Sequence, residues 1–199
     1  MKIFKIGTIS EEKIARKETL VTLVRGEIII FPTETVYGVG VDSENAAAIK
    51  KLYKLKGRPE GKPFQWLVHD AKIAKAGSLQ WGEQAEKLAR AFWPGPLTLV
   101  MPAKDGTMGW RVPKQSWLLG LLKEWGRPLT ATSANISGEP PPKDLSTAIK
   151  PFSQEAGVAV DGGEIGEGPA STVVILDGDH IRILRQGAIS EEDISRILK

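Results

Sequence analysis

The chain contains no cysteine and only two histidines, His69 and His180, among its 199 residues. The lack of cysteine excludes disulfide bonds, thiolate zinc sites, iron–sulfur clusters and a cysteine nucleophile. Two histidines are too few for a multi-histidine metal site. No apolar run approaches the roughly 20 residues that a membrane helix needs, and the first residues lack a signal-peptide apolar region. We therefore expect a cytoplasmic globular protein that does not contact a membrane.

Charge of the two signs is nearly balanced, and one short segment carries the excess. The chain has 27 lysines and arginines against 24 acidic residues, which gives a formal charge of +3. Residues 50–62 contain six lysines and arginines and one glutamate, so the rest of the chain is slightly acidic. Such a run is either the solvated face of a helix or a site for phosphates or nucleic acid, and its spacing leaves both open.

Alternating strand and helix signals predict an α/β fold in a single domain over residues 1–199. A helix capped by Ser10 should run to about Arg25, and a buried strand at 27–31 should follow it. The turn at 177–179 favours a late hairpin, so the twisted sheet should mix parallel and antiparallel strands between flanking helices. Further strands are expected at 64–68, 97–101, 128–132, 157–161, 171–176 and 180–184, and further helices at about 43–56, 70–76, 82–92, 116–125 and after Ser190.

Three polar segments could carry chemistry. The first, 32–40, lies between a strand and a helix, where α/β folds bind ligands. The second, 56–63, holds lysines and an arginine on a loop that prolines stiffen, which suits phosphate oxygens. The third, 130–138, has four hydroxyls and an amide in nine residues after a strand and could hold phosphate or sugar oxygens. Each segment could also be an ordinary turn or helix end.

Taken in order, the motifs of this chain resemble those of the YrdC-like threonylcarbamoyl-AMP synthases of the short, TsaC type. They span nearly the whole sequence, and the resemblance implies one YrdC-like domain without the C-terminal domain of longer relatives. The motifs are FPTETVYGVG (31–40), KGRP with KP (56–59 and 62–63), FWPGPLTLV (92–100), RVP (111–113), PLTATSANISG (128–138), STVVIL (171–176) and ILRQGAIS (183–190).

The resemblance implies an L-threonylcarbamoyladenylate synthase, which is a nucleotidyltransferase. Threonine and bicarbonate or CO2 would give N-carboxy-threonine, whose carbamate oxygen attacks the α-phosphate of ATP and releases pyrophosphate. Threonylcarbamoyl-AMP would then pass to partner proteins that modify an adenosine in tRNA, and Mg²⁺ would accompany the phosphates. In-line attack at phosphorus requires positioning and charge neutralisation rather than a nucleophilic side chain, so the cationic segment fits this chemistry.

The resemblance also implies roles for individual residues. Lys56 and Arg58 would be the catalytic cations, and together with Lys62 they would hold the ATP phosphates. Arg111 would pair the carboxylate of threonine bidentately. The remaining implied residues are Thr107, Ala131, Ser133, Asn135, Pro141 and Arg185 for ATP, Thr35 and Ser171 for threonine, and Tyr37 for the bicarbonate pocket, with no side chain assigned to a metal.

One position departs from the family pattern, and two other functions stay open. Many relatives have a histidine where this chain has Leu67, and His69 would share its face if the strand continues. The chain could instead be a double-stranded RNA or tRNA-binding module without turnover, whose basic segment grips the nucleic-acid backbone. It could also be a nucleotide-binding regulatory protein. The loop 138–150, with prolines at 140–142, is the expected lid or hinge.

Overall fold

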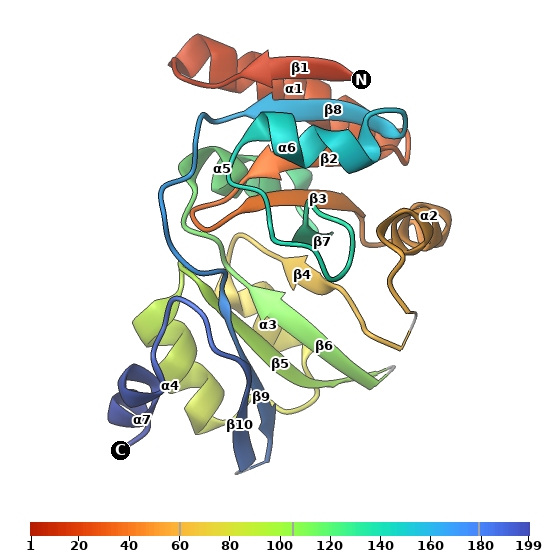
Figure 1. The fold of residues 1–199 in the computed structure, drawn as a ribbon. Coiled ribbons are helices and arrows are strands. Elements are labelled where there is room, and N and C mark those ends of the chain that lie inside the picture. The colour runs from red at the N-terminus through yellow and green to blue at the C-terminus, as the bar shows by residue number, and fades with distance from the viewer. Residues whose placement is uncertain (60, 105, 179) are drawn as a thin grey trace.

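A computed structural model describes residues 1–59, 61–104, 106–178 and 180–199, and within them ten strands form one sheet (Figure 1). The strand order is β1-β8-β2-β3-β7-β4-β6-β5-β9-β10. The strands are β1 Lys2–Lys5, β2 Ile28–Pro32, β3 Tyr37–Asp42, β4 Gln65–Leu67, β5 Leu97–Ala103, β6 Gly106–Arg111, β7 Leu129–Ser133, β8 Ala156–Asp161, β9 Thr172–Asp177 and β10 His180–Arg185.

Helices pack on this sheet at both ends. Figure 1 shows the chain beginning at β1 on one edge and ending after α7 near the other edge, where α7 lies beside α4. None of the helices in the described ranges is long and apolar enough to cross a membrane. The helices are α1 Ile9–Val24, α2 Ala46–Lys56, α3 Ala71–Gly77, α4 Glu83–Phe92, α5 Ser116–Trp125, α6 Leu145–Ile149, the 3₁₀ turn η1 Lys150–Phe152 and α7 Glu191–Leu198.

The sheet is mixed, which confirms the predicted fold class. Strands β1 and β2 both pair with β8 in parallel, and β4 with β6 and β5 with β9 are also parallel pairs. The other five neighbouring pairs are antiparallel, including the expected β9–β10 hairpin. Its predicted turn runs through Asp179, which lies outside the described residues.

Two expected local features differ from the structure. Thr8, rather than Ser10, caps α1, because the hydroxyl of Thr8 accepts from the backbone N–H of Glu11 while the Glu11 carboxylate accepts from the backbone N–H of Thr8. This reciprocal pair satisfies two free N–H groups, whereas Ser10 already lies in the first turn. The polar segment 32–40 is mostly strand: only 33–36 forms a turn, and β3 pairs with β2 and β7.

In the half of the sheet that contains β2, side chains alternate between two core layers, one on each face. Ile29 and Phe31 of β2 pack with residues of α1 and α5, whereas Ile28 and Ile30 pack with residues of α2 and α6. Because side chains alternate across a strand, this half of the sheet is buried on both faces. Strand β2 accordingly reads as a continuous apolar run rather than as an alternating one.

The other half of the sheet uses its two faces differently. Leu97, Leu99 and Trp110 pack with residues of α3, α4 and α7 in a second core. Their neighbours Thr98 and Val100 point to the opposite face and line a cavity instead. The strand pattern apolar-polar-apolar at 97–99 therefore separates a core from a polar cavity.

Substitution of Gly187 by alanine should destabilise the wall of this cavity. A Cβ at this position would lie 2.2 Å from the Ala170 carbonyl oxygen and 2.6 Å from the Thr172 nitrogen. Because these are backbone atoms, the segment must move, and we expect a loss of about 1–3 kcal/mol in the free energy of unfolding. Chemical denaturation of Gly187→Ala and of the unaltered protein measures this loss. Gly166→Ala, where a Cβ meets open space, is the control, and equal stability of the two variants would contradict the close packing.

Candidate functional site

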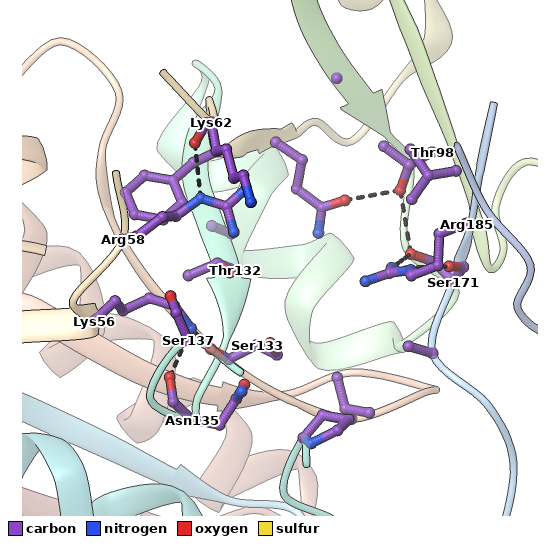
Figure 2. A pocket seen from close by; sticks show the side chains of 18 of the residues that line it. Lys56, Arg58, Lys62, Thr98, Thr132, Ser133, Asn135, Ser137, Ser171 and Arg185 are labelled. Carbon is purple, nitrogen blue, oxygen red and sulfur yellow. Dashed lines mark hydrogen bonds between the residues drawn. The ribbon is translucent and has the colours of Figure 1, made fainter. Parts of the chain in front are cut away.

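A cavity of about 440 Å³ lies on the open face of β4, β5, β6 and β9. Figure 2 shows Lys56, Arg58 and Lys62 on one side of it and Thr98, Ser171 and Arg185 on the other. The cavity therefore gathers side chains from the loop after α2, from the sheet and from the end of β10. The lining includes eleven of the residues that the sequence predicted, which are Thr35, Lys56, Arg58, Lys62, Arg111, Ala131, Ser133, Asn135, Pro141, Ser171 and Arg185.

Lys56 is the last residue of α2, and its side chain is only 1% exposed. The following Gly57 adopts a left-handed conformation with φ of 58°, which ends the helix and lets the chain turn toward the cavity. The ammonium donates to the carbonyl oxygens of Ser133 at 2.5 Å and Asn135 at 2.7 Å. Burial, and then the charge of Arg58, lower the pKa of Lys56 to about 8. Lys56 thus joins α2 to the loop after β7 while keeping one N–H for a ligand.

Arg58 is held by the loop that carries it. Its Nε donates to the carbonyl oxygen of Lys62 at 2.7 Å, and its Nη2 donates to that of Pro63 at 3.1 Å. The guanidinium lies over the ring of Phe64, 5.2 Å from its centroid. These contacts fix the planar group without neutralising its charge, because the partners are carbonyls and an aromatic ring.

Arg111, on β6, is 3% exposed and has three protein partners. Its Nε donates to the Gly95 carbonyl oxygen at 3.1 Å, and its Nη2 donates to Glu34 Oε1 at 2.7 Å and to Thr35 Oγ1 at 3.2 Å. Among the described residues, Nη1 has no partner. One nitrogen is therefore available to an anion, and the predicted bidentate pairing would require Glu34 or Thr35 to give way.

Arg185 is held in a similar way beside Ser171, on the side of the cavity opposite Lys56 and Arg58 (Figure 2). Its Nε and Nη2 donate to the Ser171 carbonyl oxygen at 3.1 and 2.8 Å, and Nη2 also donates to Ser171 Oγ at 3.0 Å. Partial desolvation, followed by the charges of Arg111 and Arg58, lowers the pKa of Arg185. All three arginines line the same cavity.

The loop after β7 closes on itself around Asn135. The Asn135 amide donates from Nδ2 to the carbonyl oxygens of Ile136 and Glu139, both at 2.8 Å. Its Oδ1 is buried and has no partner among the described residues. A buried acceptor without a donor costs about 1–3 kcal/mol, and this one belongs to a residue that lines the cavity.

Two predicted site residues lie outside the cavity lining. Tyr37 is fully buried, its hydroxyl donates to the Gly163 carbonyl oxygen at 2.7 Å, and it accepts from the Gly162 N–H at 3.1 Å. Burial raises the pKa of this phenol to about 12. Its hydrogen-bonding capacity is thus used within the fold, which does not suit a bicarbonate ligand. Thr107 is exposed on β6, near the end of that strand remote from Arg111.

The family's histidine position also has a structural explanation here. Leu67 packs in the core with α5 and is absent from the cavity lining. Strand β4 ends at Leu67, and His69 is absent from the cavity lining. The shared face that would bring His69 into the site is therefore not formed.

The cavity also contains polar residues that the sequence reasoning missed. These residues are Gln65, Thr98, Thr132, Ser137 and Glu139. Gln65, Thr98 and Thr132 lie on strands, whereas Ser137 and Glu139 lie in the loop after β7. A polar side chain between apolar neighbours, as in Leu97-Thr98-Leu99, was the signal that could have identified Thr98.

Removal of Glu34 should cost more stability than removal of an exposed ion-pair partner. The Glu34 side chain is 19% exposed against the 3% exposed Arg111, so Glu34→Ala leaves a buried guanidinium without its counter-charge. We expect a loss of about 3 kcal/mol in the free energy of unfolding, measured by denaturant titration. Glu44→Ala, at 64% exposure opposite Arg127, should cost less than about 1 kcal/mol. Equal losses in both variants would contradict the burial of the Glu34–Arg111 pair.

Comparison with known proteins places the chain in a family. The family model described as "Sua5_yciO_yrdC: Telomere recombination" matches residues 21–187. The threonylcarbamoyl-AMP synthase of Bacillus subtilis is 37% identical over 189 residues, covering 88% of this chain and 54% of that protein. The threonylcarbamoyl-AMP synthase of Vibrio campbellii is 32% identical over 183 residues, covering 86% of this chain and 98% of that protein. The chain thus spans about half the length of the Bacillus relative and almost all of the Vibrio one.

Solved structures agree with this assignment. Sua5 of Pyrococcus abyssi complexed with L-threonine superposes with a TM-score of 0.92 at 32% identity, covering 100% of this chain and 61% of that one. YciO of E. coli superposes with a TM-score of 0.86 at 21% identity, covering 98% and 100%, and shows the shared fold. The predicted YrdC-like fold is confirmed, and the chain belongs to the Sua5/YciO/YrdC family.

Proposed function

We propose that this chain is an L-threonylcarbamoyladenylate synthase, which forms threonylcarbamoyl-AMP and pyrophosphate from L-threonine, bicarbonate or CO2, and ATP. The observation that carries the proposal is one cavity with cationic side chains at both ends. Lys56, Arg58 and Lys62 lie at one end, and Arg111 with Thr35 and Ser171 lies at the other. Such a cavity suits a nucleotide and an amino acid that must meet, and relatives with the same fold carry the name of this activity.

At the first end, the cations would bind and orient the triphosphate. The carbamate oxygen of N-carboxy-threonine attacks the α-phosphorus, the bond from that phosphorus to the bridging oxygen breaks, and pyrophosphate leaves. Negative charge on the phosphoryl oxygens and the leaving group then needs donors that are already in place. Lys56 and Arg58 meet this need because backbone carbonyls fix both before a ligand arrives.

At the second end, Arg111 would bind the carboxylate of threonine through Nη1. The Sua5 structure with L-threonine supports an amino-acid subsite in this fold. Ser171 and Thr35 supply hydroxyls beside this guanidinium and that of Arg185. We infer that ATP and threonine approach each other along the floor between the two ends.

Mg²⁺ belongs to this proposal as a companion of ATP. In the described part of the chain, no group of three or more acidic residues or histidines could hold a metal ion. The ion would therefore be bound chiefly by phosphate oxygens and water, which Mg²⁺ prefers to retain. The adenylate would pass to tRNA-modifying partner proteins.

The alternative of an RNA-binding module receives less support. A module that grips a nucleic-acid backbone needs exposed cations along a surface. Here Lys56 is 1% exposed and Arg111 is 3% exposed, and both face a cavity that fits a small anion better than a duplex. Direct tRNA contact would be an added property rather than the main function.

The proposal predicts a product that mass spectrometry can detect. Protein incubated with ATP, L-threonine, bicarbonate and Mg²⁺ should form threonylcarbamoyl-AMP, and pyrophosphate release should require threonine. Arg58→Ala should reduce kcat/KM by an amount equivalent to about 2–4 kcal/mol, as expected for loss of one preorganised donor. Lys54→Ala, an exposed lysine on the same helix, should retain activity. No adenylate from the unaltered protein, or threonine-independent pyrophosphate release, would refute the function.

Affinity for ATP should fall as the pH rises above about 8. The pKa of Lys56 is lowered to about 8, so above that pH the ATP-free protein increasingly carries a neutral amine. Since only the ammonium attracts phosphate, the affinity should fall by up to about tenfold per pH unit. Calorimetric titration with ATP from about pH 7 to 9 measures this affinity. Lys56→Arg should flatten the profile, because arginine stays charged in this range. An equally steep profile in Lys56→Arg would assign the pH dependence to another group.

A further inference from the structure

A chain of hydrogen bonds runs from Arg185 across the floor of the cavity to Gln65. Arg185 Nη2 donates to Ser171 Oγ at 3.0 Å, Ser171 Oγ lies 3.2 Å from Thr98 Oγ1, and Thr98 Oγ1 donates to Gln65 Oε1 at 2.8 Å. Figure 2 shows the part of this chain that joins Arg185, Ser171 and Thr98. Strands β4 and β5, the residue before β9 and the end of β10 are thereby linked through side chains alone.

The direction of each bond follows from the donors available. A guanidinium only donates, and the single hydroxyl proton of Thr98 goes to the Gln65 carbonyl oxygen. Ser171 must therefore donate its proton to Thr98. At the end of the chain, Gln65 accepts through Oε1, and its Nε2 keeps both hydrogens. In the part of the chain that the structure describes, Nε2 has no protein partner, although Gln65 lines the cavity.

The neighbours of Gln65 leave space above the floor. Gln65 pairs with Gly109 of β6 on one side and with Ala131 of β7 on the other, and all three residues line the cavity. Thr98 lies on β5, beyond β6, so the glutamine side chain passes over Gly109 to reach it. A Cβ at Gly109 would lie 3.3 Å from Thr98 Cγ2 and 3.5 Å from Gln65 Cβ, which would crowd this crossing. The small residues on both sides make Gln65 the amide at the centre of the floor.

We propose that Gln65 Nε2 binds the carboxyl oxygens of the one-carbon substrate, first in bicarbonate and then in the carbamate formed from it. This inference rests on the proposed function. Charged groups would already bind the two outer parts of the ligands. Lys56 and Arg58 would bind the phosphates, and Arg111 would bind the amino-acid carboxylate. The one-carbon unit joins those parts, so it must lie between the two ends, where Gln65 stands. A neutral donor there holds an oxygen without competing with the arginines for either end.

Thr98 is a positioning residue in this arrangement. It fixes which face of the Gln65 amide points into the cavity, because its hydroxyl donates to Oε1. Without that hydroxyl the amide could turn and present its oxygen to an anionic ligand. Thr98→Val keeps the shape of the side chain and removes the hydroxyl, whereas Thr98→Ser keeps the hydroxyl.

The test measures KM separately for bicarbonate, L-threonine and ATP in bicarbonate-depleted buffer. Gln65→Met should raise the KM for bicarbonate about tenfold, as expected for a lost hydrogen bond to a charged group, and change the other two less than about twofold. Thr98→Val should shift the same constant in the same direction, and Thr98→Ser should restore it. Gln154→Met, at an exposed site, is the matched control and should leave all three constants unchanged.

Each outcome decides the proposal. An unchanged KM for bicarbonate in Gln65→Met, or a rise confined to threonine or ATP, would overturn the role of Gln65 while leaving the proposed function in place. If Gln65→Met does not fold, Thr98→Val and Thr98→Ser give the same decision without altering the glutamine. Absence of adenylate from the unaltered protein would instead remove the proposed function, and this inference with it.

Discussion

The constraint on which the site depends is repulsion among cations that line one cavity. Lys56, Arg58, Arg111 and Arg185 are each held by backbone carbonyl oxygens, and Glu34 is the one carboxylate bonded to any of them among the described residues. Carbonyl dipoles fix the side chains but leave their net charge in place. The cavity therefore keeps its attraction for anions, and the donors need no rearrangement when charge develops on a ligand. Burial first, and then the charges of neighbouring arginines, lower the pKa of Lys56 and of Arg185.

The sheet holds these side chains in place. At its N-terminal half, helices cover both faces, and the buried strands provide a rigid base. At the other half, Leu97 and Leu99 anchor one face while Thr98 and Val100 face the cavity. Since the same strands contribute to a packed core and to the floor, the polar side chains are set by the register of the sheet rather than by mobile loops.

The sequence supported the fold class and the cationic loop because both depend on local signals. Apolar periodicity located most strands, and Gly57 marked the end of α2. The strand at Tyr37–Asp42 was missed because Gly38 and Gly40 interrupt its apolar pattern. Close packing explains both glycines: the Phe31 ring lies against both, and the Thr130 carbonyl oxygen also lies against Gly40. Gln65 and Thr98 were missed for a different reason. Their importance comes from a contact across β6, and no local pattern encodes which residues of separate strands become neighbours.

Two buried oxygen atoms near these cations lack a hydrogen-bond donor in the described part of the chain. Glu34 Oε2 and Asn135 Oδ1 have no partner among the described residues, although cations line the same region. Each costs about 1–3 kcal/mol as an unpaired buried group, and the fold tolerates both next to an excess of positive charge. A ligand with phosphates or carboxylates alone would leave them unpaired. A ligand that also carries N–H or O–H donors, as a nucleotide and an amino acid do, could pair with Asn135 Oδ1, because Asn135 lines the cavity, whereas Glu34 is not among the lining residues.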